Sequence, residues 1–169
     1  MAQLTYEDYA ELPEGRYEII DGELYLQASA TPRHQEIVLN LLMHLHPYLR
    51  HHGNGEVFQA RIDVLLSKHD IVEPDIIVIK SERASIVGEK NIQGAPNIVI
   101  EVLSEETRHV DEVKKRQLYE RSGVEEYWIV ESVIEQVWIN RGGASERVEE
   151  TITTPLLPGF SLDVREVFA

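Results

Sequence analysis

Two short apolar segments constrain the fold more than any other feature of the chain. Residues 76–80 read "IIVIK" and residues 97–103 read "NIVIEVL". Neither alternates apolar with polar residues, as a strand with one face in water does, so both are predicted to be strands buried on both faces. Asp75 directly precedes the first strand, and Glu101 lies inside the second. The chain must therefore neutralise two interior acids, because an isolated buried charge is costly.

The flanking segments predict further strands and two helices. "YEIIDGELYL" predicts a hairpin with its turn at Asp21-Gly22. Thr31 and Pro32 are typical of a helix start, apolar residues follow at helical spacing, and Pro47 is expected to kink or end this helix. Gly123 is expected to end a second helix. The remaining strands are predicted within residues 55–67, 125–130, 135–140 and 147–152.

This order of elements is typical of an α/β or α+β domain. We expect a mixed central β-sheet flanked by helices, in one domain that covers residues 1–169. No apolar run approaches the ~20 residues needed to cross a bilayer. The polar amino terminus does not resemble a secretory leader. The sequence therefore predicts a cytoplasmic protein without a membrane segment.

Charge and cysteine content limit the possible functions. The net charge is −14, from 30 acidic and 16 basic residues, and there is no cysteine. The absence of cysteine excludes disulfides and thiolate metal sites. The acidic surplus opposes binding to nucleic acid, which depends on neutralising phosphates. Any polyanion would need a local basic patch or bridging cations to approach this protein.

The two interior acids indicate a metal site. Carboxylates on two strands of one sheet can converge on a divalent cation, and oxygen ligands of this kind suit Mg²⁺ or Mn²⁺. Such an ion can polarise a phosphate and lower the pKa of a bound water. We therefore consider Asp75 and Glu101 candidate metal ligands.

Lys114 is the candidate cation of this site. At helical spacing it shares a face with Val110 and Leu118, which are expected to contact the sheet. The Lys114 stem is therefore predicted to turn inward, whereas Lys115 and Arg116 point more toward solvent. An inward amine can position an attacking water and stabilise charge on a phosphate. Asp111 is placed to orient it.

Structural explanations exist for each of these residues. Asp75 can cap backbone N–H groups at the start of its strand. Glu101 can belong to a structural ion pair with Arg108 or Lys114. Lys114 itself can be a solvated residue in a basic run.

The ordered set of motifs resembles the Uma-two family of restriction-endonuclease-like proteins, which belongs to the PD-(D/E)XK nuclease superfamily. The resemblance extends from about Tyr17 to Val130. Its elements are Pro74-Asp75, Glu101-Val102-Leu103-Ser104, Thr107, Asp111, Lys114, Tyr119, Gly123-Val124 and Glu126-Tyr127-Trp128.

The resemblance implies a restriction-endonuclease-like core and a metal site made by Asp75 and Glu101. In the parent motif a lysine stands two residues after the second acid, where this chain has Leu103. The family is thought to carry that lysine on the following helix, which implies Lys114. His34 and Glu18 occupy positions where family members have polar residues near the site, so they are supporting candidates.

These observations favour a Mg²⁺-dependent endonuclease that acts on DNA, with Asp75, Glu101 and Lys114 as catalytic residues. Two alternatives stay open. A non-catalytic binding or assembly protein with the same fold would suit the charge of −14. A hydrolase of a smaller phosphate ester would use the same residues and be less hindered by an acidic surface. By analogy with the superfamily we expect a homodimer.

Overall fold

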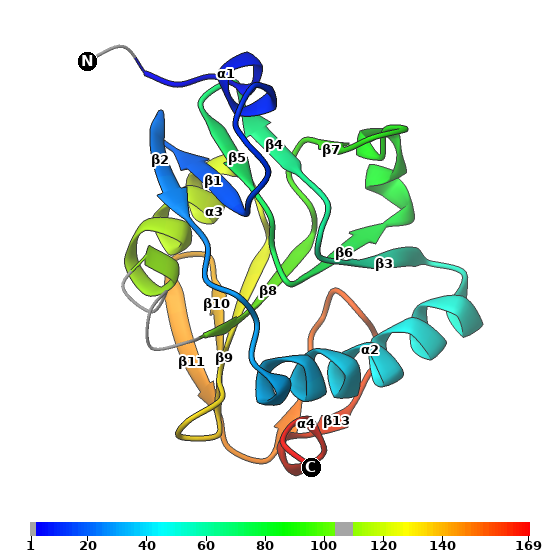
Figure 1. The fold of residues 1–169 in the computed structure, drawn as a ribbon. Coiled ribbons are helices and arrows are strands. Elements are labelled where there is room, and N and C mark those ends of the chain that lie inside the picture. The colour runs from blue at the N-terminus through cyan, green and yellow to red at the C-terminus, as the bar shows by residue number, and fades with distance from the viewer. Residues whose placement is uncertain (1–2, 104–109) are drawn as a thin grey trace.

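The computed structural model describes residues 3–103 and 110–169, with side chains described at 3–103 and 112–169. The two apolar segments form β6 (Ile76–Lys80) and β8 (Ile98–Leu103), neighbours in a six-stranded sheet of order β11-β10-β9-β8-β6-β3 (Figure 1). As predicted, β8 is buried along its whole length and β6 is buried except at its last residue. The other strands are β3 (Gly55–Gln59), β9 (Glu126–Glu131), β10 (Gln136–Arg141) and β11 (Ala144–Val148).

The six-stranded sheet is mixed, as expected. β8 and β9 are parallel, whereas β6 pairs antiparallel with both β3 and β8. The strands β9, β10 and β11 form an antiparallel meander. The predicted segment at residues 55–67 divides between β3 in this sheet and a strand in the second sheet.

A five-stranded sheet of order β2-β1-β5-β4-β7 adjoins the first. Its strands are β1 (Tyr17–Ile20), β2 (Glu23–Leu26), β4 (Val64–Ser67), β5 (Asp70–Val72) and β7 (Ile92–Gln93). The predicted hairpin is β1–β2, and its turn residues Asp21 and Gly22 have φ of 54° and 77°. Only residues 73–75 separate β5 from β6. Asp75 therefore lies where the chain passes from one sheet to the other.

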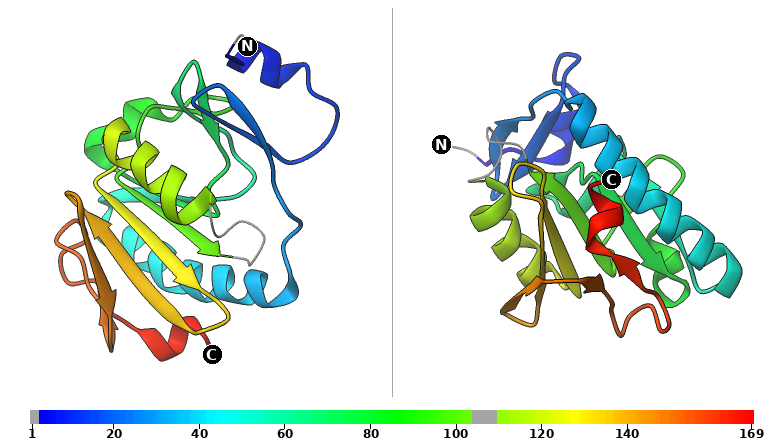
Figure 2. Two further views of the ribbon diagram at one scale, coloured as in Figure 1. Left: turned by 90° about the vertical axis from the view of Figure 1, so that its left-hand side faces the viewer. Right: turned by 90° about the horizontal axis from the view of Figure 1, so that it is seen from below.

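One helix packs on each face of the six-stranded sheet (Figure 2). The long helix α2 (Pro32–His52) covers one face, where Leu41 and Leu45 join a core that includes Ile100 and Trp128. On the other face lie the π-helical segment η2 (Val110–Lys115) and the helix α3 (Arg116–Ser122). Leu118 joins the core on that face. The expected sheet between helices is confirmed.

The ends of α2 agree with the sequence signals, but its interior does not. The Thr31 side chain accepts a hydrogen bond from the His34 amide at 3.2 Å, and Gly53 ends the helix with φ of 60°. Pro47 was expected to kink or end the helix, and the second alternative was wrong, because α2 continues to His52. Pro47 is exposed, so water can satisfy the Met43 carbonyl that the missing N–H leaves without its helical donor.

Short elements complete the described part of the chain. They are α1 (Tyr6–Ala10), the 3₁₀-helix η1 (Ser81–Ile86), β12 (Thr151–Ile152), β13 (Leu162–Asp163) and α4 (Val164–Val167). The strand predicted at residues 147–152 is divided between β11 and β12. None of the helices in the described ranges is long and apolar enough to cross a membrane.

We expect Leu41→Ala to lower the free energy of unfolding by about 2–5 kcal/mol, because it leaves a cavity between α2 and the sheet. Leu39→Ala on the same helix is the matched control, since Leu41 is fully buried and Leu39 is 56% exposed. The control should change stability by less than about 0.5 kcal/mol. Urea denaturation of both variants measures the difference, and equal losses would contradict the assigned packing face of α2.

Candidate active site

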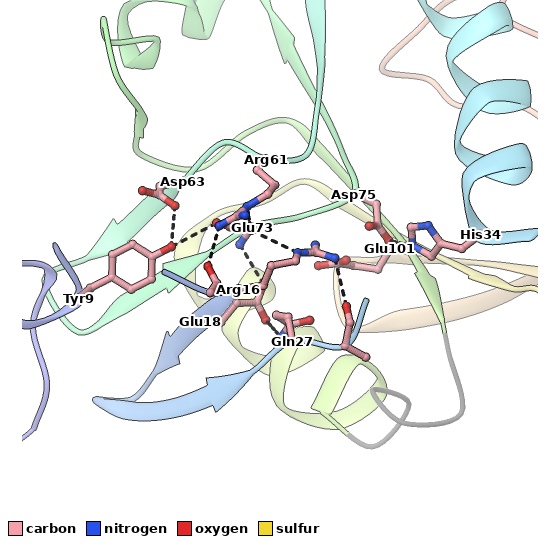
Figure 3. Close-up of polar contacts among 12 residues, drawn as sticks. Tyr9, Arg16, Glu18, Gln27, His34, Arg61, Asp63, Glu73, Asp75 and Glu101 are labelled. Atoms are coloured by element: carbon pink, nitrogen blue, oxygen red, sulfur yellow. Dashed lines mark hydrogen bonds and ion pairs between the residues drawn. The ribbon is translucent and has the colours of Figure 1, made fainter. Parts of the chain in front are cut away.

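The register of β6 and β8 brings the two predicted acids together. Ile76 pairs with Ile100 in this antiparallel ladder, so the next step along it sets Asp75 opposite Glu101. Residues directly opposed in an antiparallel pair have Cβ atoms about 4.5–5.5 Å apart. Both side chains are buried. Figure 3 shows their carboxylates close together, with His34 of α2 beside them.

Asp75 is held by one strand and one helix. Its Oδ2 accepts a hydrogen bond from the Val102 amide at 2.8 Å and lies 3.0 Å from Nε2 of His34. His34 is in the first turn of α2, so the start of that helix fixes its position. The structural role considered for Asp75, accepting a backbone N–H, is therefore present, and it occurs next to Glu101.

Glu101 is held by two donors from the helical elements on the face of the sheet away from α2. Its Oε1 accepts from Nζ of Lys115 at 2.8 Å and from the hydroxyl of Tyr119 at 2.9 Å. Burial raises the pKa of Tyr119 well above its ordinary value, and the charge of Glu101 raises it further. The hydroxyl therefore keeps its proton and donates to the carboxylate.

Lys115 connects Glu101 to the second sheet. Its Nζ lies 2.8 Å from Oε2 of Glu18 in β1 as well as 2.8 Å from Glu101, and the Lys115 side chain is 1% exposed. Glu18 is also bonded by Gln27 at 2.5 Å and by the amide of Glu73 at 2.9 Å. The supporting residue Glu18 thus lies at the site, because one ammonium contacts acids from both sheets.

Lys114 does not join this group. Its side chain is 39% exposed, and its Nζ contacts Glu23 at 3.1 Å and the hydroxyl of Tyr25. The prediction that Lys114 turns inward and Lys115 outward was wrong. The prediction assumed regular α-helical spacing from Val110 to Leu118. The π-helical segment η2 lies between them and changes the hydrogen-bond spacing from four residues to five. The face that each residue presents is shifted as a result.

The short helix α3 contained the signal that was missed. Leu118 and Tyr119 are both buried, and Lys115 lies three and four residues before them. Residues three and four apart share a helix face. Lys115 has this spacing to both Leu118 and Tyr119, whereas Lys114 has it only to Leu118, so the pair indicates that Lys115 is the lysine that faces the sheet. The side chains of Asp111 and Arg108, which were considered as partners, lie outside the described residues.

Basic residues lie on the other side of Asp75. Oε2 of Glu73 is 3.7 Å from Nε of Arg16 and 3.4 Å from Nε of Arg61 (Figure 3). The hydroxyl of Tyr9 donates to Oδ1 of Asp63 at 2.8 Å and also lies 3.3 Å from Oε1 of Glu73. Burial raises the pKa of Tyr9, and its contacts with Asp63 and Glu73 raise it further, so this hydroxyl also stays protonated.

Comparison with known proteins shows the family to which this chain belongs and a solved structure with a similar fold. The sequence model of the Uma-two family (Uma2), described as "Putative restriction endonuclease", matches residues 5–165. The chain belongs to the Uma-two family. A crystal structure described as a "putative nuclease" from Anabaena variabilis is similar, with a TM-score of 0.84 and 19% identity over 98% of this chain and 97% of that chain. This likeness confirms the restriction-endonuclease-like fold. No curated protein matches the sequence.

The two lysines of this Uma-two protein provide a matched test of the buried network. We expect Lys115→Met to lower the free energy of unfolding by about 3–5 kcal/mol, because it leaves Glu18 and Glu101 buried without their shared cation. Lys114→Met should have little effect, since the Lys114 side chain is 39% exposed and contacts the exposed Glu23 and the half-buried Tyr25. Urea denaturation near neutral pH compares them, and similar losses would contradict the register of the helix.

The raised pKa of Tyr119 predicts a specific alkaline behaviour. The folded protein keeps this proton, whereas the unfolded chain loses it near the ordinary pKa of 10.0. The stabilisation from this group is therefore fully present below about pH 10 and decreases as the pH rises further. Tyr119→Phe should be less stable at neutral pH but should lose stability less steeply above about pH 10. Urea denaturation across this range tests it, and parallel curves for both proteins would contradict it.

Proposed function

We propose that the chain is a metal-dependent endonuclease of the PD-(D/E)XK type that hydrolyses phosphodiester bonds of DNA. The observation that carries the proposal is the meeting of Asp75 and Glu101 at opposed positions of two buried strands, with the Lys115 ammonium 2.8 Å from Glu101. This is the acid, acid and lysine set that the superfamily motif requires. The lysine comes from the helical segment that follows β8, and it is Lys115.

The residues present fit a magnesium or manganese ion. In the described part of the chain, no group of three or more His, Cys, Asp or Glu residues is arranged to hold a metal. Mg²⁺ is commonly bound through only one or two carboxylates, with waters and substrate phosphates completing its shell. Asp75 and Glu101 would hold the ion, which would supply a polarised phosphate and a water of lowered pKa.

The chain's own residues have distinct roles in this proposal. The Val102 amide and His34 orient Asp75, while Tyr119 orients Glu101. Lys115 is fixed between two carboxylates, so its ammonium can orient the attacking water and stabilise the negative charge that develops on the phosphate. Because burial fixes these groups before substrate arrives, little reorganisation is needed during the reaction.

The first test is DNA cleavage. Purified protein with Mg²⁺ or Mn²⁺ is expected to cleave plasmid, single-stranded or branched DNA. The near-isosteric changes Asp75→Asn and Glu101→Gln should each reduce the rate by about 100-fold or more, because each removes a ligand charge. Lys115→Gln should reduce it comparably, whereas Lys114→Gln should retain the activity of the parent protein.

Circular dichroism and urea denaturation serve as controls that each variant is folded in the assay. Cleavage that survives both Asp75→Asn and Glu101→Gln would rule out the proposed metal site. Calorimetric titration then separates the alternatives: an intact site binds at least one Mg²⁺ or Mn²⁺, and a purely structural protein binds none. Hydrolysis of a small phosphodiester without any DNA cleavage would assign the site to a smaller phosphate ester instead.

A further inference from the structure

A cavity of about 200 Å³ opens directly beside Asp75. Its wall includes His34 from α2, Gln59 at the end of β3, and both Arg16 and Arg61. Two arginines therefore face this space together with only one acidic residue, Asp75. When the adjoining Glu73 is counted as well, the charges here balance, whereas the whole chain has a net charge of −14.

The fold fixes Arg61 at this place. β3 pairs with β6 so that Gln59 is opposite Ile76, and the amide of Ala60 donates to the carbonyl of Asp75 at 3.0 Å. Arg61 is thus the next residue after a backbone contact with the candidate metal ligand. Its Nη2 donates to the carbonyl of Gly15 at 2.7 Å, and its side chain is 52% exposed.

Arg16 approaches the cavity from the segment before β1. Its Nη1 donates to the carbonyl of Ala28 at 3.1 Å, and its side chain is 23% exposed. The same carboxylate oxygen of Glu73 lies near the Nε atoms of both arginines, and Glu73 is 5% exposed. One buried acid therefore lies near two guanidinium groups, and with Asp75 the two arginines and two acids of this cluster balance in formal charge.

Such a cluster suits phosphate. Arginine has five N–H donors in a planar arrangement that matches phosphate oxygens, and only part of that capacity is used by Gly15, Ala28 and Glu73. Both arginines lie on the same side of Asp75 (Figure 3). A strand whose scissile phosphate reached Asp75 and Glu101 would carry its neighbouring phosphate over this cavity.

We infer that Arg16 and Arg61 form a phosphate-binding subsite that adjoins Asp75 and holds the backbone of a nucleic acid strand next to the bond that is cut. The inference rests on the proposed function and assigns its substrate-positioning residues. It also indicates how an acidic protein can approach a polyanion: the two arginines cancel the acidic surplus at the place where the strand must lie. The subsite contacts phosphates only, so it is insensitive to base sequence.

The test measures binding without catalysis. Fluorescence anisotropy follows a labelled single-stranded oligonucleotide in EDTA over a range of salt concentrations. Arg61→Gln should weaken binding and reduce the magnitude of the salt dependence, d log K/d log[salt], by about 0.7, the value for one lost phosphate contact on a single strand. Arg16→Gln should act in the same direction, and Arg61→Lys should restore part of the salt dependence because it keeps the charge.

Arg50→Gln is the matched control. It removes the same charge from an exposed position at the far end of α2, sixteen residues from His34 and therefore about 24 Å along the helix axis. Arg61 is half exposed, so Arg61→Gln keeps the subsite testable if Arg16→Gln is destabilised. Equal salt dependence for Arg61→Gln and Arg50→Gln would overturn the inference, as would failure of the parent protein to bind the oligonucleotide.

The outcomes distinguish this inference from the proposed function. Binding that depends on Arg61 without any cleavage supports the subsite while removing the nuclease proposal. Cleavage whose KM is unchanged in Arg61→Gln and Arg16→Gln supports the nuclease while removing the subsite. Arg61-dependent binding of inorganic phosphate by calorimetry, without binding of the oligonucleotide, would overturn the assignment to a strand and indicate a small phosphate ester.

Discussion

The ammonium of Lys115 and the two carboxylates that it contacts hold the centre of this protein together. Glu18 comes from β1 of one sheet, Glu101 from β8 of the other, and Lys115 from the helical segment that follows β8. Charges this deeply buried are tolerated only when they are paired and hydrogen-bonded. The two sheets and the helical segment therefore have to keep one relative arrangement, and Tyr119 and Gln27 satisfy further positions on the same carboxylates.

The same contacts admit a structural and a functional explanation, and the energetics favour their having both. A buried ion pair often contributes no more stability than well-packed apolar residues of similar volume. Stability alone therefore gives no reason for an acid at position 75, directly before the apolar strand β6, or at position 101, inside the apolar strand β8. A site that must present fixed charges to a phosphate does require them there, and the backbone and side-chain donors around Asp75 and Glu101 keep those charges in place before any substrate binds.

The distribution of charge matters more for this protein than its sum. At physiological ionic strength, exposed charges more than about 8 Å apart are largely screened from one another. The acidic surplus spread over the surface is therefore only a weak obstacle at a given cavity, where the nearest groups dominate. Arg16 and Arg61 lie next to Asp75 and Glu73, so the charges of these two arginines cancel those of the two acids there.

Patterns in the amino-acid sequence were sufficient to predict the two buried strands, the hairpin, both ends of α2, the helix on each side of the sheet and the family. These features depend on local composition and on patterns repeated within one element. Asp75 and Glu101 could also be found this way, because a charge inside an apolar strand is conspicuous. The choice of Lys114 failed because the π-helical segment breaks the spacing on which it relied, although the adjacent Leu118 and Tyr119 already favoured Lys115. Only the tertiary structure decided that Arg16, Arg61 and Glu73 gather beside Asp75: their positions depend on how β3, β5 and the segment before β1 meet, and contacts between distant segments leave no periodic pattern in the chain.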